Sequence, residues 1–135
     1  MRDWKQTWRE GIAPLLTDRH LEVLRDGLAR DDPALIQGKT TSPSAFNPDN
    51  VERPANGACV LGFCGWKGDG LETVKQISAF FNDLCHRVDK QMDCSGYHSR
   101  FIRWFDDGKR EVMRVELLAE VELELTRRQH DLPNL

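Results

Sequence analysis

The pattern of apolar and polar positions predicts a mostly α-helical chain. Its most regular stretch runs from residue 71 to residue 92, where apolar side chains recur every three or four positions, as on one face of a helix. These side chains are Leu71, Val74, Ile77, Phe81, Leu84, Val88 and Met92. Thr73 and Gln76 have the spacing of a capping box, and Asp69 is an alternative cap just before them. We expect this helix to form part of the packed centre.

A second long helix is predicted from Lys109 to Arg128, and it carries apolar residues on two faces. At the helical period, one face holds Met113, Leu117, Leu118, Val121 and Leu125, and the other holds Val112, Val115, Ala119 and Leu123. One core cannot easily cover both sides of a helix, so we expect either a central helix or a subunit interface. Val112, Val115 and Leu123 are therefore candidate interface residues, and a homodimer is one way to cover them.

The same predicted helix carries a column of like charges. Glu116, Glu120 and Glu124 are four positions apart, a spacing at which glutamates repel one another. Arg127 and Arg128 can offset the repulsion at the C-terminal end. A solvated surface is the simplest interpretation, whereas a basic partner or a divalent ion is the more specific one.

Tryptophans near the start of the chain are also candidates for a contact surface. Trp4 and Trp8 would share one face of a short helix, because they lie four positions apart. They either pin this helix to the core or contact a partner, so both are counted as candidate interface residues. Four further aromatic residues line one side of another predicted helix, where core burial is the simpler interpretation: Tyr97, Phe101, Trp104 and Phe105.

The stretch from residue 56 to residue 70 reads NGACVLGFCGWKGDG. Its apolar run, with glycines at both ends, predicts an extended segment from Cys59 to Cys64 that leads into a glycine turn. Glycines allow backbone N–H groups to turn inward, so this turn is a candidate phosphate-binding site. Its residues are Gly65, Lys67, Gly68 and Gly70. The stretch matches neither the dinucleotide-binding nor the P-loop pattern, and a tight connection is the simpler interpretation.

The cysteines suggest a second kind of site. Thiolates and imidazoles are preferred zinc ligands, and Cys59, Cys64, Cys94 and His98 include two pairs with ligand-like spacing. A zinc-binding or thiol-based redox protein is therefore one hypothesis. The alternative is that these cysteines are buried apolar groups, because the chain has no C-x-x-C pair.

Residues 39 to 57 predict a long loop, since this segment contains Pro43, Pro48 and Pro54 and few large apolar side chains. A connection of this length is usually either functional or mobile. The six residues from His130 to Leu135 are predicted to form a frayed tail. With 135 residues, the chain is expected to fold as a single domain.

The charge of the chain excludes some classes of function. There are 19 basic and 22 acidic residues, spread along the chain, so no basic field is available for nucleic acid. The start of the chain is charged and lacks an apolar signal-peptide core, and no later stretch is long enough to span a membrane, which predicts a cytoplasmic protein. Neither the G-x-S-x-G nor the H-E-x-x-H motif occurs, so no catalytic residues are assigned.

Three segments together resemble a family of small cyanobacterial proteins of no known activity: ACVLGFCGWKGDGL, the downstream WFDD and the upstream LIQGKTTSP. The resemblance implies a cytosolic, photosynthetic setting and no mechanism. Our first functional hypothesis is a small binding or regulatory protein that contacts a protein partner through a helical or aromatic surface. The alternatives are the zinc or redox protein and a phosphate-ligand binder at the glycine turn.

Overall fold

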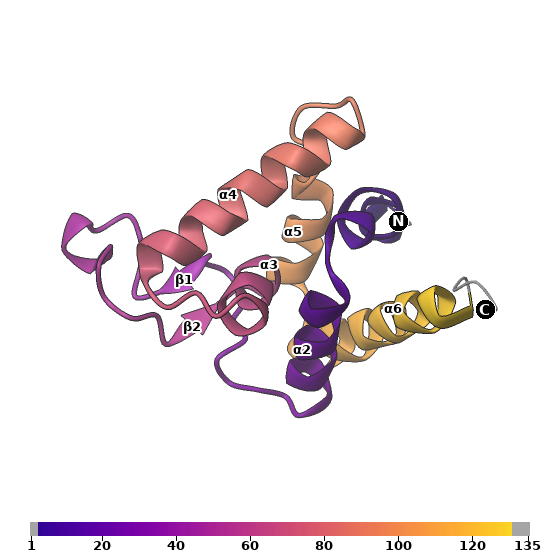
Figure 1. Cartoon of the computed structure of the whole chain (residues 1–135), viewed down its shortest axis with the longest axis horizontal. Coiled ribbons are helices and arrows are strands. Elements are labelled where there is room, and N and C mark those ends of the chain that lie inside the picture. The colour runs from indigo at the N-terminus through magenta and orange to yellow at the C-terminus, as the bar shows by residue number, and fades with distance from the viewer. Residues whose placement is uncertain (1–2, 131–135) are drawn as a thin grey trace.

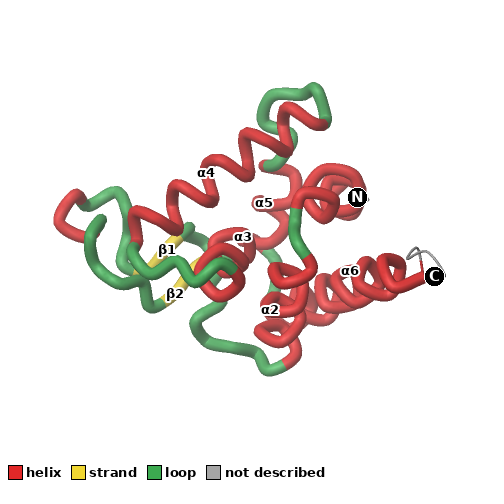
Figure 2. Tube along the Cα trace, viewed as in Figure 1, coloured by secondary structure: helices red, strands yellow, loops and turns green. Residues whose placement is uncertain are grey.

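The computed structural model describes residues 3–130, and the predicted mostly α-helical fold is confirmed (Figure 1, Figure 2). The α-helices are α1 (Asp3–Gln6), α2 (Asp18–Ala29), α3 (Val60–Phe63), α4 (Val74–Gln91), α5 (Ser99–Asp107) and α6 (Arg110–His130). Two π-helical segments, η1 (Thr7–Ile12) and η4 (Cys64–Gly68), continue α1 and α3, and 3-10 turns form η2 (Ala13–Leu15) and η3 (Pro48–Asn50). None of these helices is long and apolar enough to cross a membrane. The predicted tail lies outside the described residues, except for His130 at the end of α6.

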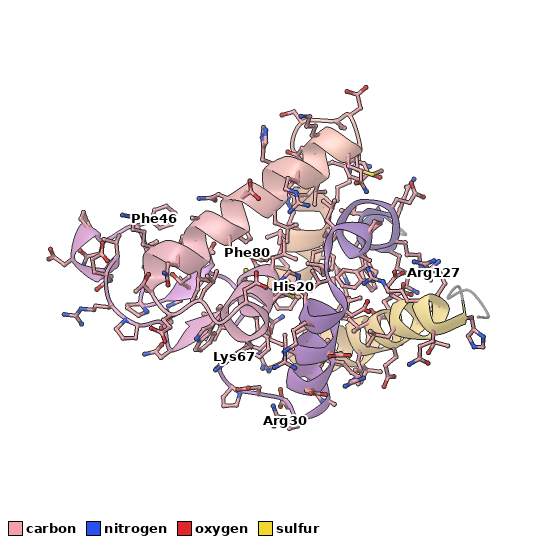
Figure 3. All side chains as sticks on the ribbon, viewed as in Figure 1. His20, Arg30, Phe46, Lys67, Phe80 and Arg127 are labelled. Carbon is pink, nitrogen blue, oxygen red and sulfur yellow. The ribbon has the colours of Figure 1, made fainter. Side chains whose placement is uncertain are left out.

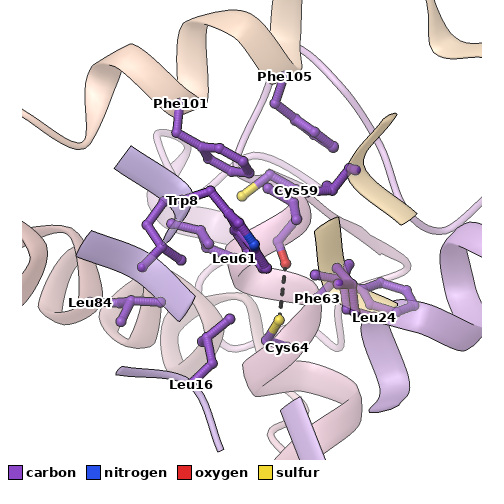
Figure 4. Close-up of a cluster of buried hydrophobic side chains, with 14 of the residues drawn as sticks. Trp8, Leu16, Leu24, Cys59, Leu61, Phe63, Cys64, Leu84, Phe101 and Phe105 are labelled. Carbon is purple, nitrogen blue, oxygen red and sulfur yellow. Dashed lines mark hydrogen bonds between the residues drawn. The ribbon is translucent and has the colours of Figure 1, made fainter. Parts of the chain in front are cut away.

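The short helix α3 lies in the middle of the core, and all four of its residues are buried (Figure 4). The prediction of an extended segment from Cys59 to Cys64 is therefore wrong. Only Cys59 has extended backbone, as the N-cap of α3, and the Cys64 thiol donates to the Val60 carbonyl 3.4 Å away, one helical turn back. A helix buried on every side shows no alternation of apolar and polar positions, so the pattern could not distinguish it from a strand.

The extended backbone lies just before this helix. Strand β2 (Gly57–Ala58) pairs antiparallel with β1 (Thr41–Ser42), in the register Thr41 opposite Ala58. This small sheet holds the start of the 39–57 loop against the core. The later part of the loop is tied to the start of α4, where the amides of Val74 and Lys75 donate to loop carbonyls at 2.9 Å.

Helix α4 begins as the capping-box pattern predicts. The Thr73 hydroxyl accepts from the Gln76 amide at 3.1 Å, and the Gln76 side chain accepts from the Thr73 amide at 3.1 Å. Asp69 is instead bonded to His20, so it does not cap this helix. Val74, Ile77, Leu84, Cys85 and Val88 form the buried face of α4, close to the predicted apolar face.

Helices α2 and α6 pack in opposite directions, and arginines of α6 fasten both ends of the pair. Near the end of α2, Arg114 donates to the Leu28 carbonyl at 2.7 Å, and this carbonyl also accepts from the Asp31 amide at 3.3 Å. Near its start, Arg128 donates to Asp18 and to the carbonyls of Ala13 and Leu16, at 2.7–2.9 Å. These contacts fix α6 along one side of the molecule (Figure 1).

Candidate interaction surface

Three of the four exposed large apolar residues between residues 3 and 130 lie on α6. Val112, Val115, Ala119 and Leu123 recur every three or four positions and form a row that we call the α6 outer face. Val112, Val115 and Leu123 are 53%, 62% and 56% exposed. The opposite side of the helix packs into the core through Met113, Leu117 and Val121. The two apolar faces predicted for this helix therefore differ, since one is buried and the other is open to solvent.

Acidic side chains flank the outer face. Glu111, Glu116 and Glu122 are exposed and lie on its two sides at the helical period. Within residues 3–130, none of the three accepts a hydrogen bond or forms an ion pair. The outer face is thus an apolar row bordered by glutamates that form no ion pair within the described residues.

The other members of the predicted acidic column are neutralised inside the molecule. Glu120 is buried on the core side, where Arg9 holds it with two parallel hydrogen bonds of 2.8 and 2.7 Å. The same hydrogen bonds raise the pKa of Arg9. Arg127 and Arg128 both donate to Glu124, as the sequence suggested. Burial opposes ionisation of Glu124, but these arginines hold its pKa below the ordinary value.

A shallow hollow of about 740 Å³ adjoins the outer face. Glu116 forms one side of this hollow, and the indoles of Trp4 and Trp104 lie against it in a parallel stack with ring centres 3.6 Å apart. Arg100 and Arg103 of α5 complete the rim. Val112 of the outer face is one helical turn before Glu116 of the hollow, so the two are neighbours on α6.

Trp4 and Trp8 do not present an aromatic surface of their own. Trp8 is almost completely buried against Phe101, with ring centres 5.6 Å apart, and Trp4 is buried except for the edge that borders the hollow. The interpretation that these residues pin the N-terminal helix to the core is confirmed. Trp8 therefore has no exposed surface with which to contact a partner.

The four predicted zinc ligands do not come together. Cys59 and Cys64 are buried in the core, whereas Cys94 is exposed in the turn after α4. No group of three or more His, Cys, Asp or Glu side chains between residues 3 and 130 is arranged to hold a metal ion. Burial raises the pKa of the Cys59 thiol to about 12, so this cysteine is a neutral, apolar core group.

His98 takes part in a turn and does not belong to a metal site. Its ring nitrogen Nδ1 lies 2.9 Å from Oδ1 of Asp89, and the backbone amides of Gly96 and His98 donate to the same carboxylate. Burial of Asp89 opposes its ionisation, but these hydrogen bonds hold its pKa below the ordinary value. Asp89 therefore closes the connection between α4 and α5.

The glycine turn is filled by side chains and does not form a phosphate cradle. A Cβ atom on Gly65 would lie 2.6 Å from the Phe80 ring, and one on Gly68 would lie 2.8 Å from the His20 ring. The Lys67 ammonium lies over the Trp66 ring, 3.9 Å from its centre. Gly70 has a positive φ of 75° and turns the chain toward α4. Gly65 and Gly68 thus allow close packing, which is the simpler of the two interpretations.

No family model, curated protein or solved structure matches this chain. The resemblance to small cyanobacterial proteins therefore stays a prediction, and the case for the α6 outer face depends on its own chemistry.

Proposed function

We propose that this protein is a small binding or regulatory module that holds an amphipathic, basic helix of a protein partner on the α6 outer face. The observation that supports the proposal is the exposed row of Val112, Val115 and Leu123 on a helix whose other face is already buried. An apolar row bordered by polar residues is typical of a surface that binds another helix.

The size of the row indicates how much surface a partner has to cover. A little over half of each of the three side chains is exposed, so covering them contributes roughly 1 kcal/mol each. Association itself costs about 4–15 kcal/mol in lost freedom of motion. The row alone cannot offset this cost, and we therefore expect the partner to extend over the adjoining hollow and its Trp4–Trp104 stack as well.

The charges beside the row favour a basic partner over a second copy of the chain. Glu111, Glu116 and Glu122 flank the row and form no ion pair within residues 3–130. Pairing the outer faces of two copies would place two such sets of glutamates close together, which is unfavourable. Lysines or arginines that flank the apolar face of a partner helix would neutralise them.

A pair of synthetic helical peptides tests the proposal. Both carry leucines at the same positions, and the remaining positions hold lysine in one peptide and glutamate in the other. We expect the lysine peptide to bind isotope-labelled protein and to shift the amide resonances of α6, with an affinity that falls as salt is added. Equal binding of both peptides would contradict the choice of a basic partner.

Variants of the outer face locate the binding site. The triple variant Val112→Ser, Val115→Ser and Leu123→Ser should lose peptide binding and keep its thermal midpoint, because the replaced side chains lie outside the core. The matched variant Glu111→Gln, Glu116→Gln and Glu122→Gln should keep the apolar row and lose the salt dependence. Light scattering should show that the parent protein is a monomer. If the parent is instead a dimer and the triple serine variant is a monomer, the outer face binds a second copy of the chain and the proposed partner is wrong.

A further inference from the structure

A separate cavity of about 480 Å³ lies between the 38–46 segment and helices α4 and α5. None of its lining residues belongs to α6 or to the outer face. The lining includes Phe46, Cys59, Ser78, Phe81, Ile102 and Asp106. Its volume is within the range of pockets that hold small organic molecules.

The walls of this cavity include an apolar side. Phe81 of α4 and Ile102 of α5 are partly buried there, and the buried Cys59 lies at the core end. Phe46 stands at the rim, where its side chain is 99% exposed (Figure 3). A ligand with a ring or a short alkyl chain would remove the exposed parts of these side chains from water.

Two polar groups of the cavity have unused hydrogen-bonding capacity. Asp106 accepts one hydrogen bond at Oδ1, from the Gly38 amide 2.9 Å away, and no donor among the described residues reaches Oδ2. The Ser78 hydroxyl is buried and has no partner within residues 3–130. Burial raises the pKa of Asp106, and the neighbouring Asp107 adds to the shift. A hydrogen-bond donor with positive charge would stabilise the carboxylate in this place.

We propose that this cavity binds a small organic amine, whose apolar body packs against Phe81 and Ile102 and whose ammonium group donates to Asp106. The only cationic side chain of the lining is Lys39, which is exposed and so remains solvated. An anionic ligand would have to approach the half-buried carboxylate of Asp106 and is therefore disfavoured. The amine site is independent of the function proposed for the α6 outer face.

Three probes of nearly equal size test the chemistry of the site: phenethylamine, phenethyl alcohol and hydrocinnamate. We expect phenethylamine to shift the amide resonances of the 38–46 segment, Ser78 and Ile102, and to bind about tenfold or more tightly than the alcohol, as a charge-assisted hydrogen bond implies. Hydrocinnamate should bind least. If hydrocinnamate binds as well as the amine, or if no probe shifts these resonances, the proposal is wrong.

Paired variants separate Asp106 from general effects of charge. Asp106→Asn should remove the preference for phenethylamine over the alcohol, and Asp107→Asn, at the adjacent exposed position outside the cavity, should retain it. Ser78→Leu keeps Asp106 and fills the cavity, so all probes should be lost. The triple serine variant of the α6 outer face should bind phenethylamine normally. Equal loss in the Asp106 and Asp107 variants would overturn the assignment of the carboxylate.

Discussion

Helix α5 faces the N-terminal segment on one side and the 38–46 segment on the other. Large aromatic side chains fill the space toward the N-terminal segment, whereas the space toward the 38–46 segment stays partly open. Trp4 stacks on Trp104, and Trp8 lies against Phe101, with ring centres 3.6 and 5.6 Å apart. On the other side, the 38–46 segment leaves the cavity of about 480 Å³. The same short helix therefore has one side filled by indoles, whose outer edge borders the hollow, and one side that borders the cavity, which we call the cavity side.

The residues available to each side explain the difference. The N-terminal segment brings two indoles, which fill large volumes with few rotatable bonds. The 38–46 segment has one large apolar residue, Phe46, whose side chain points into solvent. Its other side chains are mostly small or polar and cannot fill the gap beside Phe81 and Ile102. The cavity is thus a consequence of loop composition, and the pairing of β1 with β2 holds the loop in place.

Removal of an indole should produce the largest effect on stability. Trp8→Ala deletes an almost fully buried ring and leaves a void that its neighbours cannot close, so we expect a loss of about 3–5 kcal/mol in the free energy of unfolding. Urea denaturation measures this loss. The matched variant on the cavity side, Phe46→Ala, should change stability by less than about 0.5 kcal/mol, because the Phe46 ring is exposed. Similar losses in both variants would contradict the contrast between the two sides.

The glycine turn is closely packed, so a change in side-chain volume there should also lower the stability of the fold. A methyl group on Gly65 would lie 2.6 Å from the first ring atom of Phe80, so Gly65→Ala should destabilise the fold by about 1–3 kcal/mol although alanine favours helices. Gly38 provides the comparison, since its φ is 88° and nothing lies within 4 Å of a Cβ placed there. Gly38→Asn should therefore be the milder change, because asparagine tolerates positive φ. Urea denaturation of both variants compares the two glycines.

The sequence was sufficient where a signal is local or periodic. The repeat in α4 and its Thr73 cap identified that helix, and the second apolar row of α6 identified the exposed outer face. Contacts between segments that are distant in the sequence could not be predicted from local or periodic signals. Arg9 neutralises Glu120 across 111 positions of the chain, and the sequence offered only Arg127 and Arg128 as partners for the acidic column.

The candidate ligand sites show the same limit. Glycine density suggested a cradle, but Gly65 and Gly68 reflect the rings packed against them, and these rings come from other segments. The spacing of Cys94 and His98 resembled a zinc pair, but His98 is bonded to Asp89 and Cys94 is not near the core cysteines. The cavity beside Asp106 depends on how the proline-containing loop crosses α5. Only the unusual length of the loop indicated that it could be functional.

The smallest expected effect is in the pH dependence of stability, where Asp106 on the cavity side should contribute with the opposite sign to Asp89. Because burial raises the pKa of Asp106 in the folded state, the fold binds this proton more tightly than the unfolded chain does. The stabilising contribution is complete below the unfolded pKa, near 4, and is lost as pH rises through the raised folded pKa. Asp106→Asn should remove this contribution and leave stability at pH 7 within about 0.5 kcal/mol of the parent or slightly higher.

Asp89 provides the opposite case in the turn between α4 and α5. Its folded pKa is lowered, so its contribution is present above the unfolded pKa and is lost as pH falls through the lower folded value. Urea denaturation of the parent and both asparagine variants between about pH 3 and 7 measures the two slopes. Relative to the parent, Asp106→Asn should lose stability toward acid, whereas Asp89→Asn should be destabilised most at neutral pH. If the two contributions change with pH in the same direction, Asp106 is as well solvated or as well paired as Asp89. The cavity would then lack a carboxylate with unused hydrogen-bonding capacity for an amine.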